Sequence, residues 1–169
     1  KFLSDLSECL TKTLKELDVS FDSIYGPAYK GIFLASIIGT SLGESDLDIP
    51  ISFNRKEEKD HGEGGDIIGQ LPSGNVLIVD DVISAGTAAR ESIEKIKSIG
   101  ANPKVMLVGL DRQEKGSSEI SAKAELENDF ELTISSIVNL DLLISFVSDD
   151  PNFKEFKSDL EEYRSNWGA

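Results

Sequence analysis

Two adjacent carboxylates, Asp80 and Asp81, follow the apolar run at residues 76–79 and precede a stretch of small residues. Small residues let backbone N–H groups approach an anion closely, and the hydroxyls of Ser84 and Thr87 can add donors to them. A helix that begins near Thr87 would bring the partial positive charge of its N-terminus to the same point. These features predict a site for one phosphate group. The loop is not of the Walker A type, because no Gly-Lys-Ser/Thr follows it.

The two carboxylates need a partner other than the phosphate, which they would repel. Sugar hydroxyls or a bound cation are suitable partners for carboxylate oxygens. A structural interpretation is also open, in which the pair is an acidic strand end and Thr87 is the N-cap of the next helix. An isolated Asp-Asp pair would favour that interpretation. The complete run of strand, carboxylates, small-residue loop and helix favours a functional site for a sugar phosphate.

Two further segments carry positive charge in positions that suit a polyanion. The turn Tyr-Gly-Pro-Ala-Tyr-Lys-Gly at residues 25–31 can present backbone N–H groups, and Lys30 adds a cation. An ordinary turn with a solvated lysine explains that turn equally well. The segment at residues 53–65 is polar, ends in glycines and contains Arg55, three further cationic or titratable side chains at Lys56, Lys59 and His61, and no apolar periodicity. It suits a lid that closes over a polyanion, although a charged surface loop would have a similar composition.

Arg112 follows another apolar run, within the sequence Leu-Asp-Arg-Gln-Glu-Lys-Gly at residues 110–116. An arginine at the end of a strand can bind a carboxylate through two parallel hydrogen bonds. The alternative is an exposed arginine in a surface ion pair. Arg112 is therefore a candidate for recognising an anionic substrate group.

Together these motifs resemble those of the type I phosphoribosyltransferases, and most specifically those of orotate phosphoribosyltransferase of the bacterial and fungal kind. The acidic pair with its small-residue loop is the signature for phosphoribosyl pyrophosphate (PRPP), which purine enzymes share. The turn at residues 25–31, the Arg-Lys-x-x-Lys-Asp-His-Gly-Glu-Gly-Gly loop and the Asp-Arg-Gln-Glu strand end are more specific. The resemblance implies Mg²⁺-dependent transfer of the 5-phosphoribosyl group from PRPP to orotate, giving orotidine 5-monophosphate and pyrophosphate in UMP biosynthesis. It also implies a homodimer whose active sites are shared, because in this family the loop reaches the neighbouring subunit.

The resemblance assigns roles to the residues that match the motifs. Asp80 and Asp81 would bind the ribose hydroxyls, with Mg²⁺ held mainly by PRPP and near these carboxylates. Lys59 and His61 would stabilise or protonate the leaving pyrophosphate and, with the two aspartates, form the catalytic set. Ser84, where the family often has Thr, and Arg112 would contact orotate. The implied PRPP-binding residues are Tyr29, Lys30, Arg55, Lys56, Lys59, His61, Asp80, Asp81, Val82, Ile83, Ser84, Ala85, Gly86, Thr87 and Ala88.

Family members carry a segment of about forty residues before the helix that is predicted from Phe2, and this segment supplies another PRPP-contacting lysine and aromatic residues that pack on orotate. The sequence here begins at Lys1, without that segment. Three rivals are weighed against the orotate enzyme. They are a purine or uracil phosphoribosyltransferase, a PRPP-sensing regulatory module that has lost the chemistry, and a dinucleotide-binding domain, which the absence of Gly-x-Gly-x-x-Gly disfavours.

The elements that must position these residues alternate along the chain. Strands are expected at residues 23–25, 49–53, 75–79, 104–111 and 131–138, helices at residues 2–17, 31–42, 87–99, 139–148 and 153–166, and helix or loop at residues 118–128. Alternation of this kind predicts an α/β fold with a mostly parallel central sheet flanked by helices, which is the type I phosphoribosyltransferase fold with its flexible catalytic loop. Ligands of such sheets bind at the carboxyl ends of the strands, where the candidate residues fall.

Length and charge bound the remaining possibilities. A chain of 169 residues suits one domain spanning residues 1–169. The formal net charge of −14 argues against nucleic acid and anionic membranes as partners, and no apolar run is long enough to cross a bilayer. The single cysteine, Cys9, excludes an internal disulfide framework and favours a reducing compartment such as the cytoplasm.

Overall fold

A six-stranded sheet forms the centre of the computed structural model, which describes residues 1–44, 47–55 and 66–169. The strand order is β3-β2-β1-β4-β5-β6, and every pairing is parallel except that of β3 with β2. The strands are β1 (Ser23–Tyr25), β2 (Ile51–Asn54), β3 (Ile67–Gly69), β4 (Asn75–Ile83), β5 (Asn102–Asp111) and β6 (Thr133–Asn139). The predicted α/β architecture is confirmed.

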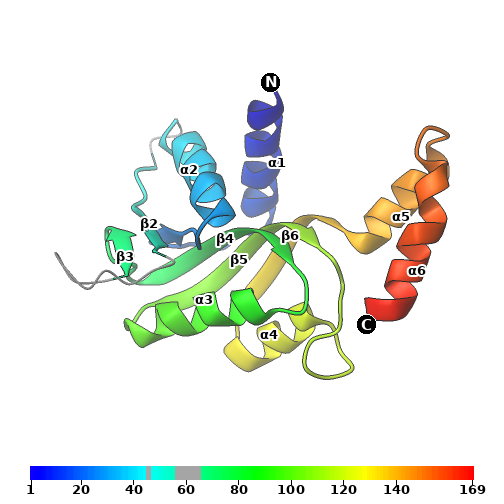
Figure 1. The fold of residues 1–169 in the computed structure, drawn as a ribbon. Coiled ribbons are helices and arrows are strands. Elements are labelled where there is room, and N and C mark those ends of the chain that lie inside the picture. The colour runs from blue at the N-terminus through cyan, green and yellow to red at the C-terminus, as the bar shows by residue number, and fades with distance from the viewer. Residues whose placement is uncertain (45–46, 56–65) are drawn as a thin grey trace.

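Helices cover both faces of this sheet (Figure 1). They are α1 (Phe2–Glu16), α2 (Lys30–Gly43), α3 (Thr87–Ser98), α4 (Ala122–Phe130), α5 (Leu140–Asp149), the short 3-10 helix η1 (Lys154–Phe156) and α6 (Lys157–Trp167). Helices α1 and α2 lie on one face, while α3 and α4 lie on the other. Within the described ranges, no helix is both long and apolar enough to traverse a bilayer.

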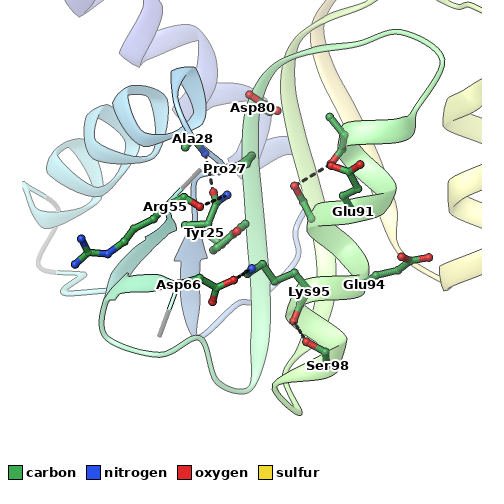
Figure 2. Close-up of a pocket in the computed structure, with 13 residues that line it drawn as sticks. Tyr25, Pro27, Ala28, Arg55, Asp66, Asp80, Glu91, Glu94, Lys95 and Ser98 are labelled. Carbon is green, nitrogen blue, oxygen red and sulfur yellow. Dashed lines mark hydrogen bonds and ion pairs between the residues drawn. The ribbon is translucent and has the colours of Figure 1, made fainter. Parts of the chain in front are cut away.

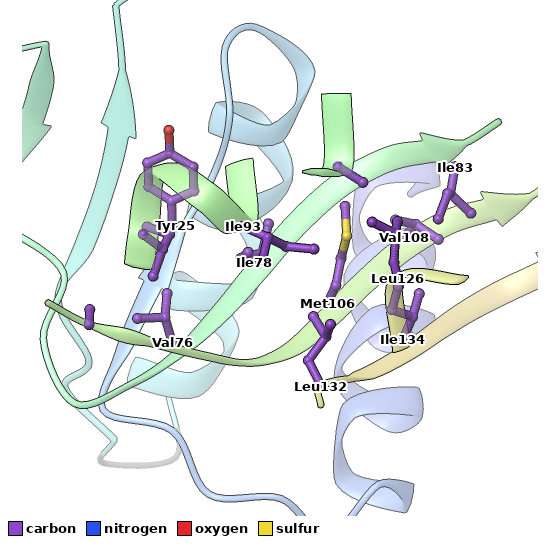
Figure 3. Packing of buried hydrophobic residues seen from close by; sticks show 13 residues of the cluster. Tyr25, Val76, Ile78, Ile83, Ile93, Met106, Val108, Leu126, Leu132 and Ile134 are labelled. Atoms are coloured by element: carbon purple, nitrogen blue, oxygen red, sulfur yellow. The ribbon is translucent and has the colours of Figure 1, made fainter. Parts of the chain in front are cut away.

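The alternation of side chains along β4 explains why both faces are apolar. Val76 and Ile78 pack with α3 and α4, whereas Leu77 and Val79 pack with α1 and α2. Figure 3 shows the first of these clusters, in which Met106 of β5 lies among the side chains. A continuous apolar run is expected for a parallel strand that is buried on both faces.

Several elements differ in extent from the sequence-based expectation, most of them by one or two residues. Strand β4 continues beyond residue 79 to Ile83, because its pairing with β5 persists through Ile83 and Asp111. Helix α3 begins at Thr87 as expected, whereas the alternative interpretation of Thr87 as its N-cap is wrong, because Gly86 is the N-cap. The short strand β3 was not expected, and the expected helix at residues 153–166 is divided into η1 and α6.

Helices α5 and α6 pack against each other at one end of the sheet (Figure 1). The chain after α6 returns to the segment that follows β5. There the N–H of Lys115 donates to the carbonyl of Trp167 at 3.0 Å, and the N–H of Ala169 donates to that of Gln113 at 3.1 Å. Trp167 and Ala169 are therefore hydrogen-bonded to the segment next to Arg112, at a strand end where the sequence predicts a candidate site.

Candidate active site

The end of β4 extends past its neighbour β1. The pairing of β1 with β4 stops at Tyr25 and Ile78, whereas the pairing with β5 continues to Ile83. Asp80 and Asp81 therefore lie in a stretch of β4 that is hydrogen-bonded to β5 on one side and borders the turn after β1 on the other. This lengthening of the strand corrects the expectation that the two carboxylates follow its end.

Two glycines bring the turn after β1 against β4. A Cβ added at Gly31 would lie 2.6 Å from the carbonyl oxygen of Val79, and one added at Gly26 would lie 2.2 Å from the carbonyl oxygen of Gly31. A side chain at either position would force the start of α2 away from the strand. The turn is also tied to the end of β2, because the N–H of Ala28 donates to Oδ1 of Asn54 at 2.8 Å.

Lys30, the first residue of α2, forms an ion pair with Asp81. Its Nζ lies 2.5 Å from Oδ2 of Asp81, and the pKa of Lys30 is raised, mainly by this hydrogen bond. The lysine side chain is 73% exposed and the aspartate side chain 33% exposed. The predicted cation and the predicted carboxylate are thus within reach of the same ligand. Tyr29, which precedes α2, is exposed beside them.

Asp80 has different surroundings from its neighbour. Successive residues of a strand point to opposite faces, and Asp80 borders a pocket beside α3 while Asp81 meets α2. Burial raises the pKa of Asp80 to about 6, and the charge of Asp81 contributes in the same direction. The N–H of Asp81 donates to Oδ1 of Asp80 at 2.9 Å and partly offsets this effect. A cation near the two carboxylates would stabilise the charged form of Asp80.

The pocket beside α3 has a volume of about 820 Å³. It lies between the turn after β1, the adjoining ends of β2 and β3, and α3 (Figure 2). Among the predicted site residues, Arg55, Asp80 and Ala88 line it. An ion pair between Lys95 of α3 and Asp66 joins the helix to the start of the β3 segment.

The predicted phosphate loop connects β4 to α3. Val82 and Ile83 are the last residues of β4, Thr87 and Ala88 are the first of α3, and the residues between them are Ser84, Ala85 and Gly86. Gly86 has a φ of 86°, a left-handed conformation that favours glycine. No side chain in the described part of the chain caps α3, so its first N–H groups are available to an anion.

Ser84 and Arg112, the two residues predicted to bind orotate, are brought together by the strand pairing. The N–H of Arg112 donates to the carbonyl of Ile83, the residue before Ser84, at 3.0 Å. The guanidinium Nη1 of Arg112 lies 3.5 Å from Oε1 of Glu114, whose side chain also accepts a hydrogen bond from the hydroxyl of Tyr163. The surroundings of Arg112 therefore include a residue of α6.

Three predicted site residues lie outside the part of the chain that the structure describes, and two residues that make contacts near the site were not predicted. Lys56, Lys59 and His61 lie outside the described residues, so their assigned roles stay predictions. Sequence reasoning missed Asn54 and Tyr163, whose contacts depend on how distant segments pack. Glu114 was within a quoted motif, and its position two residues after Arg112 was a usable signal for a partner.

Metal binding by the protein alone has little support in the described ranges, where no cluster of three or more His, Cys, Asp or Glu could hold an ion. The two carboxylates at residues 80 and 81 suit a cation that is bound mostly by other oxygens. Mg²⁺ is commonly held in that way, through one or two carboxylates, water and substrate phosphates. The residues present thus fit a cation that arrives with a phosphorylated ligand.

Comparison with known proteins gives consistent matches. Residues 1–130 match the family model described as the phosphoribosyl transferase domain. The chain is 44% identical over 167 residues to an orotate phosphoribosyltransferase of Marinobacter nauticus, covering 99% of this chain and 79% of that protein. It is 46% identical to one of Pseudomonas savastanoi, again over 167 residues, covering 98% of this chain and 78% of that protein.

Solved structures show the same relationship. The crystal structure of an orotate phosphoribosyltransferase from Francisella tularensis superposes with a TM-score of 0.78 at 32% identity, covering 99% of this chain and 80% of that one. The structure of UMP synthase from Leishmania donovani gives a TM-score of 0.75 at 26% identity, covering 98% of this chain and 33% of that one.

Proposed function

We propose that this chain, which belongs to the orotate phosphoribosyltransferase family, uses the site around Asp80, Asp81 and Arg112 to carry out the reaction of that family. The reaction transfers the 5-phosphoribosyl group of PRPP to orotate and yields orotidine 5-monophosphate and pyrophosphate, a step of pyrimidine biosynthesis. The observation that carries the assignment to these residues is the meeting of three groups at one end of β4. They are the Lys30–Asp81 pair, the uncapped start of α3 and Arg112, whose N–H donates to the carbonyl of Ile83.

The phosphate and the sugar of PRPP are assigned to β4 and the loop after it. The 5-phosphate binds the N–H groups at the start of α3 and the hydroxyls of Ser84 and Thr87, where the helix dipole favours negative charge. The ribose hydroxyls donate to Asp80 and Asp81. Because a hydroxyl donor or a cation favours a charged carboxylate, ligand binding lowers the pKa of Asp80 from its raised value.

The pyrophosphate of PRPP is assigned to the side of the site that faces α2. Lys30 exchanges its pairing with Asp81 for pyrophosphate oxygens, and Tyr29 precedes Lys30 at the start of α2. Arg55 is assigned to the pyrophosphate from the pocket that it lines with Asp80. Lys56, Lys59 and His61 join them by resemblance to the family. Negative charge develops on the pyrophosphate as it leaves, so cations fixed around it stabilise the transition state.

Mg²⁺ is proposed as the cofactor, held by PRPP oxygens and by Asp80 and Asp81. When bound, it neutralises part of the phosphate charge. The protein contributes mainly by positioning the two substrates, because orotate is already an anion and needs little activation. Arg112 binds the orotate carboxylate, and Ser84 contacts the base. A homodimer with shared active sites and a cytoplasmic location are proposed on the same family basis.

Substrate turnover tests this assignment directly. Initial rates with PRPP and Mg²⁺ are measured for orotate, uracil and adenine, and turnover is expected with orotate alone. Asp81→Asn removes one hydroxyl acceptor and the partner of Lys30, and it is expected to lower kcat/KM for PRPP by about 100-fold, the size of a lost charged contact in a site. Calorimetric titration with PRPP and Mg²⁺ gives an independent measure of binding.

The control is Asp5→Asn on the exposed surface of α1, which is expected to behave like the unsubstituted protein. Turnover of adenine, together with no turnover of orotate, would contradict the proposed function. Unchanged PRPP binding in the Asp81→Asn variant would remove this carboxylate from the site.

A further inference from the structure

A series of side-chain contacts connects Arg112 to helix α6. Nη1 of Arg112 lies 3.5 Å from Oε1 of Glu114, and the hydroxyl of Tyr163 in α6 donates to the same oxygen of Glu114. The glutamate side chain is 12% exposed, whereas that of Arg112 is 46% exposed. Glu114 is therefore directed inward, and the guanidinium extends from it toward solvent.

The electrostatic environment agrees with this arrangement. The pKa of Arg112 is raised, first by its hydrogen bond to Tyr163 and also by Glu114. The pKa of the Tyr163 hydroxyl is raised by burial and by its hydrogen bond to Glu114. Both groups thus keep their protons at neutral pH, so the hydroxyl of Tyr163 remains a donor.

The backbone around Arg112 is fixed on both sides. Upstream, its own N–H donates to the carbonyl of Ile83. Downstream, Gln113 and Lys115 exchange backbone hydrogen bonds with the residues that end and follow α6. The side chain of Gln113 also donates to Oδ2 of Asp141 and accepts from its N–H, both at 2.9 Å, which ties the same segment to α5. Both terminal helices therefore hold the residues next to Arg112.

We propose that Tyr163 and Glu114 are positioning residues that orient the guanidinium of Arg112 to receive the carboxylate of orotate. This inference rests on the proposed role of Arg112 in binding orotate. An arginine carries five N–H donors in a rigid plane, more than its contacts with Glu114 and Tyr163 require. The remaining edge of the guanidinium can bind a carboxylate, and the fixed plane reduces the side-chain entropy that binding must otherwise remove.

The test compares KM for orotate with KM for PRPP in three single variants. Arg112→Ala measures the whole contribution of the guanidinium. Tyr163→Phe removes only the hydroxyl and keeps the ring that packs α6. Arg164→Gln is the matched control, because this neighbouring residue of α6 pairs with Asp141 of α5 and not with Glu114.

We expect Arg112→Ala to raise KM for orotate by about 100-fold and Tyr163→Phe by about fivefold to tenfold, as for the loss of hydrogen bonds that involve charged groups. KM for PRPP should change less than twofold in both variants. Arg164→Gln should lower the melting temperature without changing KM for orotate. In the double variant Arg112→Ala, Tyr163→Phe, no further loss is expected beyond that of Arg112→Ala alone, because Tyr163 acts through Arg112.

Other outcomes overturn the inference in distinguishable ways. If Arg112→Ala leaves KM for orotate unchanged, the proposed assignment of Arg112 fails together with the inference. If only Tyr163→Phe has no effect, the assignment of Arg112 stands and the inference fails. If Arg164→Gln raises KM for orotate as much as Tyr163→Phe does, docking of α6 explains the effect and the hydroxyl of Tyr163 has no specific role.

Discussion

Asp80 and Asp81 are adjacent residues that the fold treats differently. Asp81 is paired with Lys30, whereas burial raises the pKa of Asp80 to about 6. Of these two carboxylates, Asp80 is the one whose charged form is disfavoured by its surroundings. Such groups are common at functional sites, where stability is given up for binding.

A pH-dependent stability difference follows for Asp80→Asn. The pKa of Asp80 in the folded protein, about 6, lies above its ordinary value of 3.8, so the native state favours the protonated form. The free energy of unfolding therefore decreases as pH rises from about 4 through about 6, and the contribution of Asp80 changes no further above that range. An asparagine side chain cannot ionise, so Asp80→Asn should be more stable than the unsubstituted protein at pH 8, by on the order of 1–2 kcal/mol after allowance for solvent screening.

Urea denaturation at pH 8 and pH 5 measures this difference. The difference in the free energy of unfolding between Asp80→Asn and the unsubstituted protein is expected to be smaller at pH 5, where Asp80 is largely protonated in the folded protein. Asp48→Asn, at an exposed position, serves as the control for replacing an aspartate by an asparagine. An equal difference at both pH values would show that ionisation of Asp80 is not its cause.

At the scale of elements, the loop between β4 and α3 depends on Gly86. Its φ is 86°, and an added Cβ would lie 3.2 Å from Cβ of Ala122 and 3.3 Å from Cδ1 of Leu126. Gly100 has a similar φ of 83°, but a Cβ there would meet nothing within 4 Å. The two positions share the backbone conformation and differ in packing.

Gly100→Ala is therefore expected to cost about 1 kcal/mol, the strain of a left-handed alanine. Gly86→Ala should cost about 1 kcal/mol more, because α3 or α4 must also shift. Urea denaturation gives both free energies of unfolding. Calorimetric titration with PRPP and Mg²⁺ should show weaker binding for Gly86→Ala only. Equal affinity of the two variants for PRPP would show that the loop does not contribute to phosphate binding.

The sequence predicted most elements of the fold, for identifiable reasons, and the structure brings several of the candidate site residues to one end of β4. Apolar runs and helical periodicity are local signals, and they identified β1, the core of β4 and α3. The extension of β4 through Asp80 and Asp81 could not be predicted in this way, because charged residues carry no apolar pattern and the extension depends on pairing with β5. The contact of Tyr163 with Glu114 spans 49 residues of sequence and depends on how α6 docks.

At the scale of the whole molecule, Arg90 joins segments that are distant in sequence. Its Nη2 lies 3.1 Å from Oε1 of Glu125 and 2.6 Å from Oδ2 of Asp129, and its guanidinium lies over the ring of Phe130. Glu125 also accepts hydrogen bonds from the backbone and hydroxyl groups of Ser117 and Ser118. Helix α3, helix α4 and the segment after β5 are thereby connected through one ion-pair network.

Arg90→Met is expected to lower the free energy of unfolding, because it leaves Glu125, whose side chain is 13% exposed, without its cation. Lys97→Met is the matched control. Lys97 also lies over Phe130, at 5.2 Å from the ring centroid, and its loss should cost less than about 0.5 kcal/mol. Urea denaturation measures both, and 1 M NaCl should reduce the difference between Arg90→Met and the unsubstituted protein. Equal losses in the two variants would assign the effect to the aromatic contact.

The fastening of residues 113–115 by the chain after α6 also sets an order of assembly during synthesis. A protein is made from its N-terminus, and segments can fold as they leave the ribosome. The strands and helices around Asp80 are complete once β5 has emerged. The surroundings of Arg112 cannot be completed until Tyr163 and the residues after α6 have been added. A growing chain therefore completes the surroundings of Asp80 before those of Arg112, and a ribosome that stalls between them leaves the surroundings of Arg112 incomplete.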